Sequence, residues 1–469
     1  MNTENTPLVE ELRPVPAVMD AVRACADWPD LVLFDSAVVH GSLGRYSFLA
    51  ADPIEREQVS TAKFGSDPFA ALKARMPAAE AMPELPPFQG GWAGLMSYEL
   101  GRCWERVPSA RYDEFQLPVL SAGLYDWVLA WDHVANQAWI ISHGWPEAEP
   151  GRRRNRAAQR IATVRQRLTN SPAPFRDDPV GTLRPLSELS PQWKSPRREN
   201  LWSNFSADEY LRALERVIEY IVAGDIFQAN LTQRLLTPAT CGPVSLYERL
   251  RSCNPAPLAG LYVCDDWAVI SASPERFLQI EARTVTTRPI KGTRRRTVQP
   301  EADLFTKDEL RESEKDQAEN VMIVDLLRND LSRVCLPSTV RVPQLCGVET
   351  FATVQHLVSE ISGTLRPGVT VWDVFRAASP GGSITGAPKV RAMEIITELE
   401  PTVRGPYTGS LFYVGADGTA DSSLLIRTFA MRHGWLTCGV GGGITAKSDP
   451  RDEYEETWHK AAGMLRALA

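Results

Sequence analysis

Short strand-like runs in this chain gather in groups and do not alternate one by one with helices. The runs fall before and after a long helical stretch, at residues 31–34, 124–131, 139–142, 260–263, 267–271, 277–281, 409–414, 424–431 and 436–440. Between the groups, the capping sequence Ser206-Ala207-Asp208-Glu209 opens an amphipathic helix that ends near Gly224. Grouped strands predict an α+β fold and argue against the regular alternation of a Rossmann fold.

The composition is that of an ordinary globular protein. Of the 469 residues, 43% are hydrophobic and 23% are charged, which excludes a mainly disordered chain. The net charge of −7 argues against nucleic acid as a partner, because such surfaces need excess Lys and Arg. The chain lacks a run of about 18 apolar residues, a recognisable targeting signal and a C-x-x-C pair. We therefore expect a cytoplasmic protein with reduced thiols and no membrane partner.

A break in composition between about residues 147 and 199 divides the chain. It contains four arginines within 152–156 and several prolines, and it predicts a helix over 152–168 followed by an irregular connector. We expect an N-terminal region at 1–150, the helix and connector at 151–199, and a C-terminal region at 200–469 that carries the chemistry. The break is expected to lie inside one large unit.

Two predicted helices each carry acidic residues three positions apart. Asp316 and Glu319 share one helix face, and Glu453 and Glu456 share another. Such pairs usually lie on solvated faces, but Glu319 runs into the apolar segment 321–324, which favours a helix packed against the core. Carboxylates of this kind suit Mg²⁺, which keeps several waters and needs few protein ligands.

Lys291 and Glu275 are candidates for catalysis. Lys291 lies between Arg288 and Arg294, and nearby cations together with burial would lower its pKa, which is about 10.4 in a free lysine. A neutral lysine is a nucleophile or a base; the alternative is a basic surface turn. Glu275 follows a strand-like run and is a candidate general acid, with a surface ion pair to Arg276 as the alternative.

Two further features have both a functional and a structural interpretation. The segment Gly439–Gly443 can point backbone N–H groups at a carboxylate, or it can form a plain hairpin turn. His356 is either a substrate contact or a satisfied histidine of the core.

Five segments carry motifs that occur together in this order. They are SPERF (273–277), PIKGT (289–293), KDQAENVMIVDLLRNDLSRV (315–334), SPGGSITGAPKVRAMEII (379–396) and EYEET (453–457). Together they resemble the chorismate-utilising enzymes, a family that includes anthranilate, aminodeoxychorismate, isochorismate and salicylate synthases. The resemblance covers nearly the whole chain. It implies an α+β fold in which antiparallel β-sheets pack as a sandwich with helices outside and two subdomains interlock.

Two positions distinguish the reactions within this family. Anthranilate synthases typically carry alanine where this chain has Lys291, and the P-I-K-G-T form is similar to that of aminodeoxychorismate synthases. Isochorismate-forming members carry a lysine base where this chain has Gln228. The resemblance therefore implies amination of chorismate at C4 to 4-amino-4-deoxychorismate, for 4-aminobenzoate and folate synthesis. The alternatives are amination at C2 with loss of pyruvate, and a catalytically silent relative that binds an amino acid.

The resemblance also implies a role for each candidate residue. Lys291 attacks C2 of chorismate, Glu275 protonates the departing 4-hydroxyl, and ammonia then adds at C4 and expels the lysine. The expected substrate contacts are Gly292, Thr293, His356, Tyr407, Arg427, Gly441, Gly442 and Gly443.

The implied cofactor is Mg²⁺, held by Glu319 and Glu456 with Asp316 and Glu453 in support through water. Since no cysteine lies in a G-x-C-x-G elbow, we expect ammonia to come from a separate glutaminase subunit or from ammonium. The family also has an N-terminal tryptophan pocket, with core packing as the alternative here. Its matching positions are Ser36, Gly44, Arg45, Tyr46, Ser47, Pro257, Leu258 and Ala259.

Overall fold

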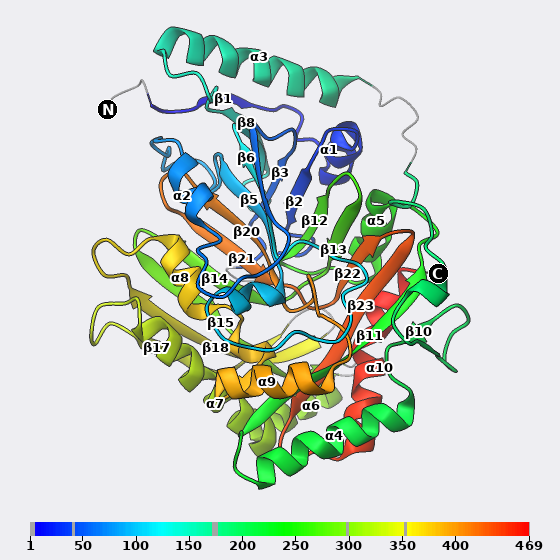
Figure 1. Ribbon diagram of the computed structural model, residues 1–469. Coiled ribbons are helices and arrows are strands. Elements are labelled where there is room, and N and C mark those ends of the chain that lie inside the picture. Colours follow the sequence, from blue (N-terminus) through cyan, green and yellow to red (C-terminus); the bar gives the residue numbers. More distant parts are fainter. Residues whose placement is uncertain (1–4, 40–42, 171–176, 297–299, 351–353, 469) are drawn as a thin grey trace.

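Two β-sheets form the body of the protein, and helices cover their outer faces (Figure 1). The structure is a computed structural model that describes residues 5–39, 43–170, 177–296, 300–350 and 354–468. Neighbouring strands pair in antiparallel fashion in both sheets, from the first strand, β1, to the strands at the centre of each sheet. The predicted α+β fold with antiparallel sheets is confirmed.

The first sheet takes strands from the beginning, middle and end of the chain. Its order is β1 (Leu8–Glu11), β8 (Gln137–Ser142), β7 (Trp127–Asp132), β3 (Tyr46–Ala50), β2 (Leu31–Asp35), β12 (Ala259–Val263), β13 (Trp267–Ser271), β22 (Thr428–Arg432), β23 (Trp435–Ile444), β11 (Gln228–Pro238), β10 (Trp202–Ser203) and β9 (Trp193–Lys194). The short β19 (Gly386–Ala387) pairs with β11 beside this path.

The second sheet also combines strands from distant parts of the chain. Its order is β16 (Ile290–Arg295), β18 (Val354–Thr364), β15 (Thr284–Arg288), β14 (Arg276–Glu281), β21 (Ala420–Leu424), β20 (Ser410–Gly415), β5 (Gly91–Met96), β6 (Leu120–Tyr125) and β4 (Glu55–Val59), with β17 (Arg341–Thr350) paired to β18. Both sheets thus combine strands from before residue 150 and after residue 200, which joins the two regions of the chain into one body.

The two sheets pack face to face through apolar side chains. Val32 and Tyr262 of the first sheet share one buried cluster with Ala93 and Leu411 of the second. Strands buried on both faces are apolar runs, such as Trp127–Trp131 within β7. This packing confirms the sandwich.

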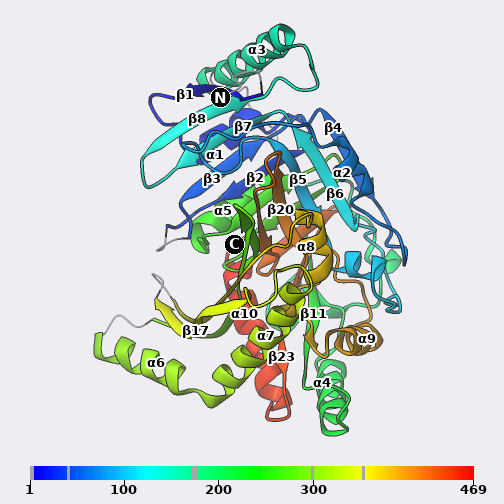
Figure 2. The same ribbon diagram turned by 90° about the vertical axis from the view of Figure 1, so that its left-hand side faces the viewer.

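Helices cover the outside of the sandwich. They are α1 (Val18–Cys25), α2 (Ala70–Arg75), α3 (Pro150–Thr169), α4 (Ala207–Val222), α5 (Pro243–Cys253), α6 (Pro300–Glu312), α7 (Glu314–Ser332), α8 (Val371–Ala378), α9 (Lys389–Leu399) and α10 (Pro450–Arg466). Figure 2 shows α6 and β17 projecting at one side, next to α7. In the described part of the chain, no helix is both long and apolar enough to cross a membrane.

The predicted helix at Ser206 forms as the capping sequence indicates. The Ser206 amide donates to Glu209 Oε2 at 2.9 Å, and the Glu209 amide donates to Ser206 Oγ at 3.2 Å. These reciprocal bonds satisfy two amides that the first turn leaves without partners. The helix predicted over 152–168 is also present, as α3.

Two segments that the sequence allowed as turns are strands. The basic segment around Lys291 lies in β15 and β16, both of which pair with β18. Gly439–Gly443 lies inside β23, paired with β11. Pairing with strands far away in the sequence outweighs the weak strand preference of glycine in both places.

Candidate active site

Lys291 and Glu275 meet at one residue of a turn. Lys291 lies on β16 and Glu275 immediately precedes β14. Lys291 Nζ donates to the backbone oxygen of Ser383 at 3.1 Å, and Ser383 Oγ donates to Glu275 Oε1 at 2.8 Å. Ser383 belongs to the 3₁₀ turn Gly382–Ile384 between α8 and α9. The structure therefore brings the predicted nucleophile and general acid together through a residue that motif analysis did not single out.

Burial favours the uncharged form of both groups and shifts their pKa values accordingly. It raises the pKa of Glu275 to about 7, against the opposing effects of the Ser383 hydrogen bond and the Lys291 charge. It lowers the pKa of Lys291, although the carboxylates of Glu319 and Glu275 oppose that change. A carboxyl group with a pKa near 7 can hold and release a proton at neutral pH, and a lysine with a lowered pKa is more often nucleophilic.

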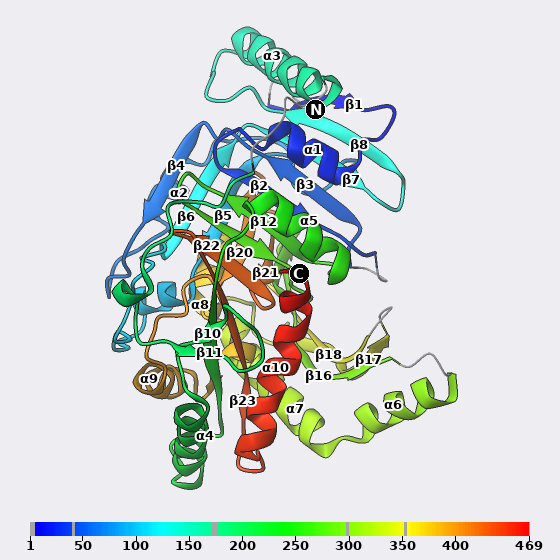
Figure 3. The same ribbon diagram turned by 90° about the vertical axis from the view of Figure 1, so that its right-hand side faces the viewer.

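The two predicted acidic pairs lie on α7 and α10, two helices that run side by side near β16 and β18 (Figure 3). Burial raises the pKa of Glu319, and the charges of Asp316 and Glu453 add to the effect, while Lys291 and Lys315 oppose it. Carboxylates from both helices are thus close enough to repel one another.

Lysines neutralise part of this negative charge. Lys315 Nζ lies 3.1 Å from Glu453 Oε1, and Lys460 Nζ lies 2.8 Å from Glu456 Oε1. Partial burial disfavours ionisation of Glu456, but the charges of Lys460 and Lys315 outweigh it and hold its pKa below the ordinary value.

The acidic residues fit a hard dication by their chemistry. Their ligand atoms are carboxylate oxygens. Burial is the main cause of the raised pKa of Glu319, and a cation would favour its charged form and relieve the smaller repulsion from Asp316 and Glu453. Within the described residues, no three acidic, histidine or cysteine side chains already surround one point as a finished metal cage. Such a set suits Mg²⁺, which keeps several of its waters.

The glycines of β23 lie against α10. A Cβ atom at Gly442 would lie 3.2 Å from Glu453 Oε2 and 3.3 Å from Lys460 Nζ, and Lys460 donates to the Gly441 oxygen at 2.8 Å. One edge of this segment pairs with β11, and β22 accompanies the other edge only as far as Cys438. Among the residues that the structure describes, the N–H groups of Gly441–Gly443 that point to that second edge have no strand partner there, whereas the Gly441 oxygen is taken by Lys460.

Gly292 and its neighbours run along α7. Gly292 has φ +65, and a Cβ atom there would lie 3.0 Å from Asp316 Cγ, so both conformation and space call for glycine. Thr293 pairs in register with His356, which is buried on β18. These predicted contacts thus lie on adjacent strands beside Lys291.

Arg427 is a partly buried cation near Glu275. Burial lowers its pKa, and the Glu275 charge opposes this effect. Among the described residues, its guanidinium has no hydrogen-bond or ion-pair partner, although its backbone oxygen accepts from Ala272 N at 3.0 Å. A partly buried guanidinium without a paired anion suits a carboxylate ligand, which it can bind through two parallel hydrogen bonds.

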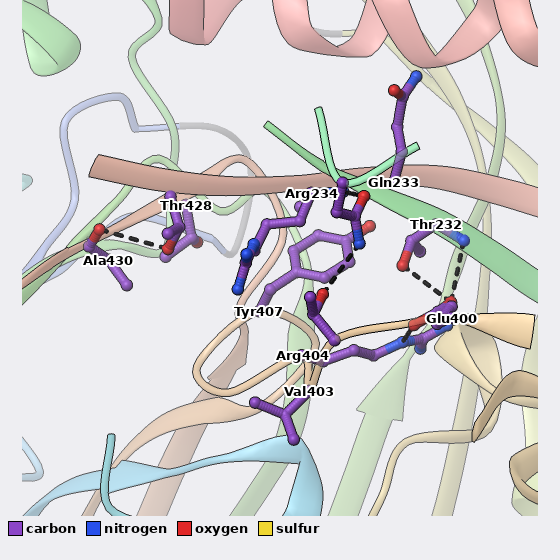
Figure 4. Close-up of a pocket in the computed structure, with 13 residues that line it drawn as sticks. Thr232, Gln233, Arg234, Glu400, Val403, Arg404, Tyr407, Thr428 and Ala430 are labelled. Atoms are coloured by element: carbon purple, nitrogen blue, oxygen red, sulfur yellow. Dashed lines mark hydrogen bonds and ion pairs between the residues drawn. The ribbon is translucent and has the colours of Figure 1, made fainter. Parts of the chain in front are cut away.

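Tyr407 lines a polar cavity (Figure 4). Its ring packs directly on Gly439, where a Cβ atom would lie 2.2 Å from the ring. The cavity is lined by Thr232, Arg234, Glu400, Arg404 and Thr428, among others. Sequence analysis missed the pair Glu400 and Arg404, which join at 2.6 Å; their spacing of four residues was the available signal.

The residues predicted for a tryptophan pocket converge at the start of β3 and β12. Ser36 Oγ donates to the Tyr46 oxygen at 2.5 Å and lies 3.4 Å from the Pro257 oxygen. The Ser36 amide donates to Ser47 Oγ at 2.9 Å. The neighbouring Asp35 carboxylate accepts from the chain's own groups, Ser47 Oγ, Tyr247 Oη and Arg251 Nε.

Comparison with known proteins supports one family. Residues 37–466 match the family described as chorismate binding enzyme. The chain is 41% identical over 403 residues to anthranilate synthase component 1 of Thermus thermophilus, covering 86% of this chain and 82% of that protein. It is 38% identical over 455 residues to aminodeoxychorismate synthase component 1 of Salmonella typhimurium, covering 93% and 92%. The solved anthranilate synthase component I from Streptococcus pneumoniae has a TM-score of 0.76 and 28% identity, covering 91% of this chain and 94% of that one.

Proposed function

The chain belongs to the chorismate binding enzymes, and from this premise we propose that it aminates chorismate at C4 to give 4-amino-4-deoxychorismate. The observation that carries the proposal is Lys291, partly buried near Glu275 and joined to it through Ser383. A lysine at this position is typical of family members that aminate C4, whereas those that form anthranilate typically have alanine.

The chemistry follows from the two groups. Neutral Lys291 bonds to C2 as the ring double bonds shift and the bond from C4 to its hydroxyl breaks. Glu275 gives the departing oxygen its proton, so that water leaves. Ammonia then bonds to C4, the bond from C2 to Lys291 breaks, and a proton from the new amine returns to Glu275. Chorismate and ammonia thus become aminodeoxychorismate and water.

The remaining site residues would bind and orient the substrate. The Arg427 guanidinium and the backbone N–H groups of Gly441–Gly443 that β22 does not cover suit its carboxylates. Glu319 and Glu456 would hold Mg²⁺, with Asp316 and Glu453 in support. The bound ion supplies positive charge next to a substrate carboxylate.

The ammonia would come from a separate glutaminase subunit. The curated relatives are named component 1 of their enzymes, which supports a two-component complex. Adding a glutaminase subunit and glutamine to the purified chain should therefore replace the need for ammonium.

Anthranilate synthesis is the second candidate, favoured by the 41% identity to the Thermus enzyme. Incubation of the purified protein with chorismate, Mg²⁺ and ammonium separates the two. C4 amination predicts chorismate consumption without pyruvate release and a product that added aminodeoxychorismate lyase converts to 4-aminobenzoate. Accumulation of anthranilate and pyruvate alone would exclude the proposal.

A further inference from the structure

We propose that Ser383 is a positioning residue that holds Glu275 and Lys291 in a fixed relation, and that its hydroxyl leaves Glu275 Oε2 as the oxygen that gives up the proton. The inference rests on the proposed function. The two hydrogen bonds of Ser383 connect strands β14 and β16 of the second sheet through a turn that belongs to neither.

The turn around Ser383 is held from two sides. On one side, the backbone oxygen of Ile384 accepts from Arg404 Nη1 at 2.9 Å and from Asn230 Nδ2 at 3.2 Å. The backbone oxygen of Thr385 accepts from the backbone N–H of Asn230 at 2.8 Å. On the other side, Gly382 packs against Leu326 of α7 so closely that a Cβ atom would lie 2.8 Å from it. Ser383 is therefore a fixed reference point for both reacting groups.

The Ser383 hydroxyl acts differently on Glu275 and on Lys291. Toward Glu275 it donates a hydrogen bond, which favours the carboxylate and orients Oε1. Toward Lys291 only the backbone oxygen of Ser383 is used, so this contact survives any change of side chain. A substitution at Ser383 thus separates the two effects.

The charged groups around Glu275 define the expected pH response. Lys291 faces it from β16, Arg427 from the segment between β21 and β22, and the Ile290 amide also favours its carboxylate. Glu319 of α7 and both Lys460 and Glu456 of α10 act on Lys291. Burial raises the pKa of Glu275, and the Ser383 hydrogen bond is the largest opposing effect, so its loss should raise that pKa further.

Three variants test the proposal. Ser383→Ala removes the hydroxyl, Ser383→Thr keeps it, and Ser422→Ala removes a buried hydroxyl of β21 that bonds to Leu278 and not to Glu275. In Ser383→Ala, kcat for chorismate consumption should fall roughly 10- to 100-fold, with KM within about twofold. In the plot of kcat against pH for this variant, the limb near pH 7, where kcat falls as pH rises, should move to higher pH. Ser383→Thr and Ser422→Ala should keep that limb in place.

A second measurement does not depend on turnover. Infrared difference spectra follow the band of the protonated carboxyl of Glu275, and Glu275→Gln identifies that band. The pH at which half of the band is lost should rise in Ser383→Ala alone. An unmoved midpoint in Ser383→Ala, or an equal shift in Ser422→Ala, would overturn the proposal. Chorismate consumption is counted whatever the product, so formation of anthranilate would refute C4 amination and leave the Ser383 result standing.

Discussion

The Nζ atom of Lys315 on α7 lies 3.1 Å from Oε1 of Glu453 on α10. Glu453 is only 5% exposed and also accepts a hydrogen bond from Ser448 Oγ at 2.6 Å. The ion pair joins the two helices that carry the proposed metal ligands. Lys315 therefore supplies positive charge to carboxylates that a bound cation would also attract.

The acidic helices should bind a divalent cation. Glu319→Gln should weaken Mg²⁺ binding about 10-fold or more, because the neutral amide removes a charged oxygen ligand. Lys315→Ala should strengthen it, because the remaining carboxylates lose a competing cation. Calorimetric titration with Mg²⁺ measures both. Asp452→Asn, an exposed change on α10, is the control, and equal affinities in all variants would contradict the assignment.

Lys291→Ala should reduce C4 amination by about 10³-fold or more, because it removes the proposed nucleophile. Chromatography of the products with ammonium as the nitrogen source measures the loss and detects any anthranilate. Lys63→Ala, at an exposed lysine remote in sequence from the motifs, should keep the normal rate. Wild-type rate and product in Lys291→Ala would rule out the covalent role.

Glu275→Gln should lower kcat by about 10² to 10⁴, the range for loss of a general acid. The pKa of Glu275 is raised to about 7 by burial, so the fraction able to donate a proton falls as pH rises through 7. The wild-type kcat profile should have a limb near pH 7, and the variant should lack it. Glu281→Gln, at the exposed end of β14, should retain the limb; its disappearance there would point to another group.

Arg404 should contribute strongly to stability. It is 3% exposed and pairs with Glu400, which is 4% exposed, so Arg404→Ala would leave a buried carboxylate without its cation. The free energy of unfolding should fall by about 3–5 kcal/mol. The control Arg216→Ala breaks an exposed pair with Glu219 and should cost about 0.5 kcal/mol or less. Urea unfolding measures both changes. If the free energy of unfolding fell equally in both variants, the pair of Arg404 and Glu400 would not contribute specifically to stability.

If the residues around Ser36 bind tryptophan, L-tryptophan should raise the thermal unfolding midpoint, because a ligand that binds the folded state stabilises it. D-Tryptophan, with its ammonium and carboxylate exchanged in space, should have a smaller effect. Ser36→Phe should fill the space and abolish the response. The absence of any shift with the L isomer would favour core packing as the role of these residues.

Local patterns in the sequence predicted four of the helices, α3, α4, α7 and α10. The capping sequence at Ser206 located the start of α4, and the acidic spacing placed Asp316 with Glu319 on α7 and Glu453 with Glu456 on α10. These signals succeed because each depends on residues three or four positions apart.

Long-range contacts were harder to predict. The bond from Ser383 to Glu275 spans 108 positions, and the bond from Lys291 to Ser383 spans 92. Nothing in the sequence near Ser383 indicates that its turn meets β14 and β16. The strand β23 was missed in part for the same reason, because its glycines become a strand only through pairing with β11.

The mixed origin of the sheets has a consequence for synthesis of the protein. Strand β5 pairs with β20, and β2 pairs with β12, so early strands depend on partners that the ribosome makes much later. At a usual rate of 5–20 residues per second, β5 precedes β20 by roughly 15 to 60 s. During that interval the edge of β5 that later pairs with β20 has no partner, and unpaired strand edges attract other chains. The nascent polypeptide should therefore depend on chaperones until its last third has emerged.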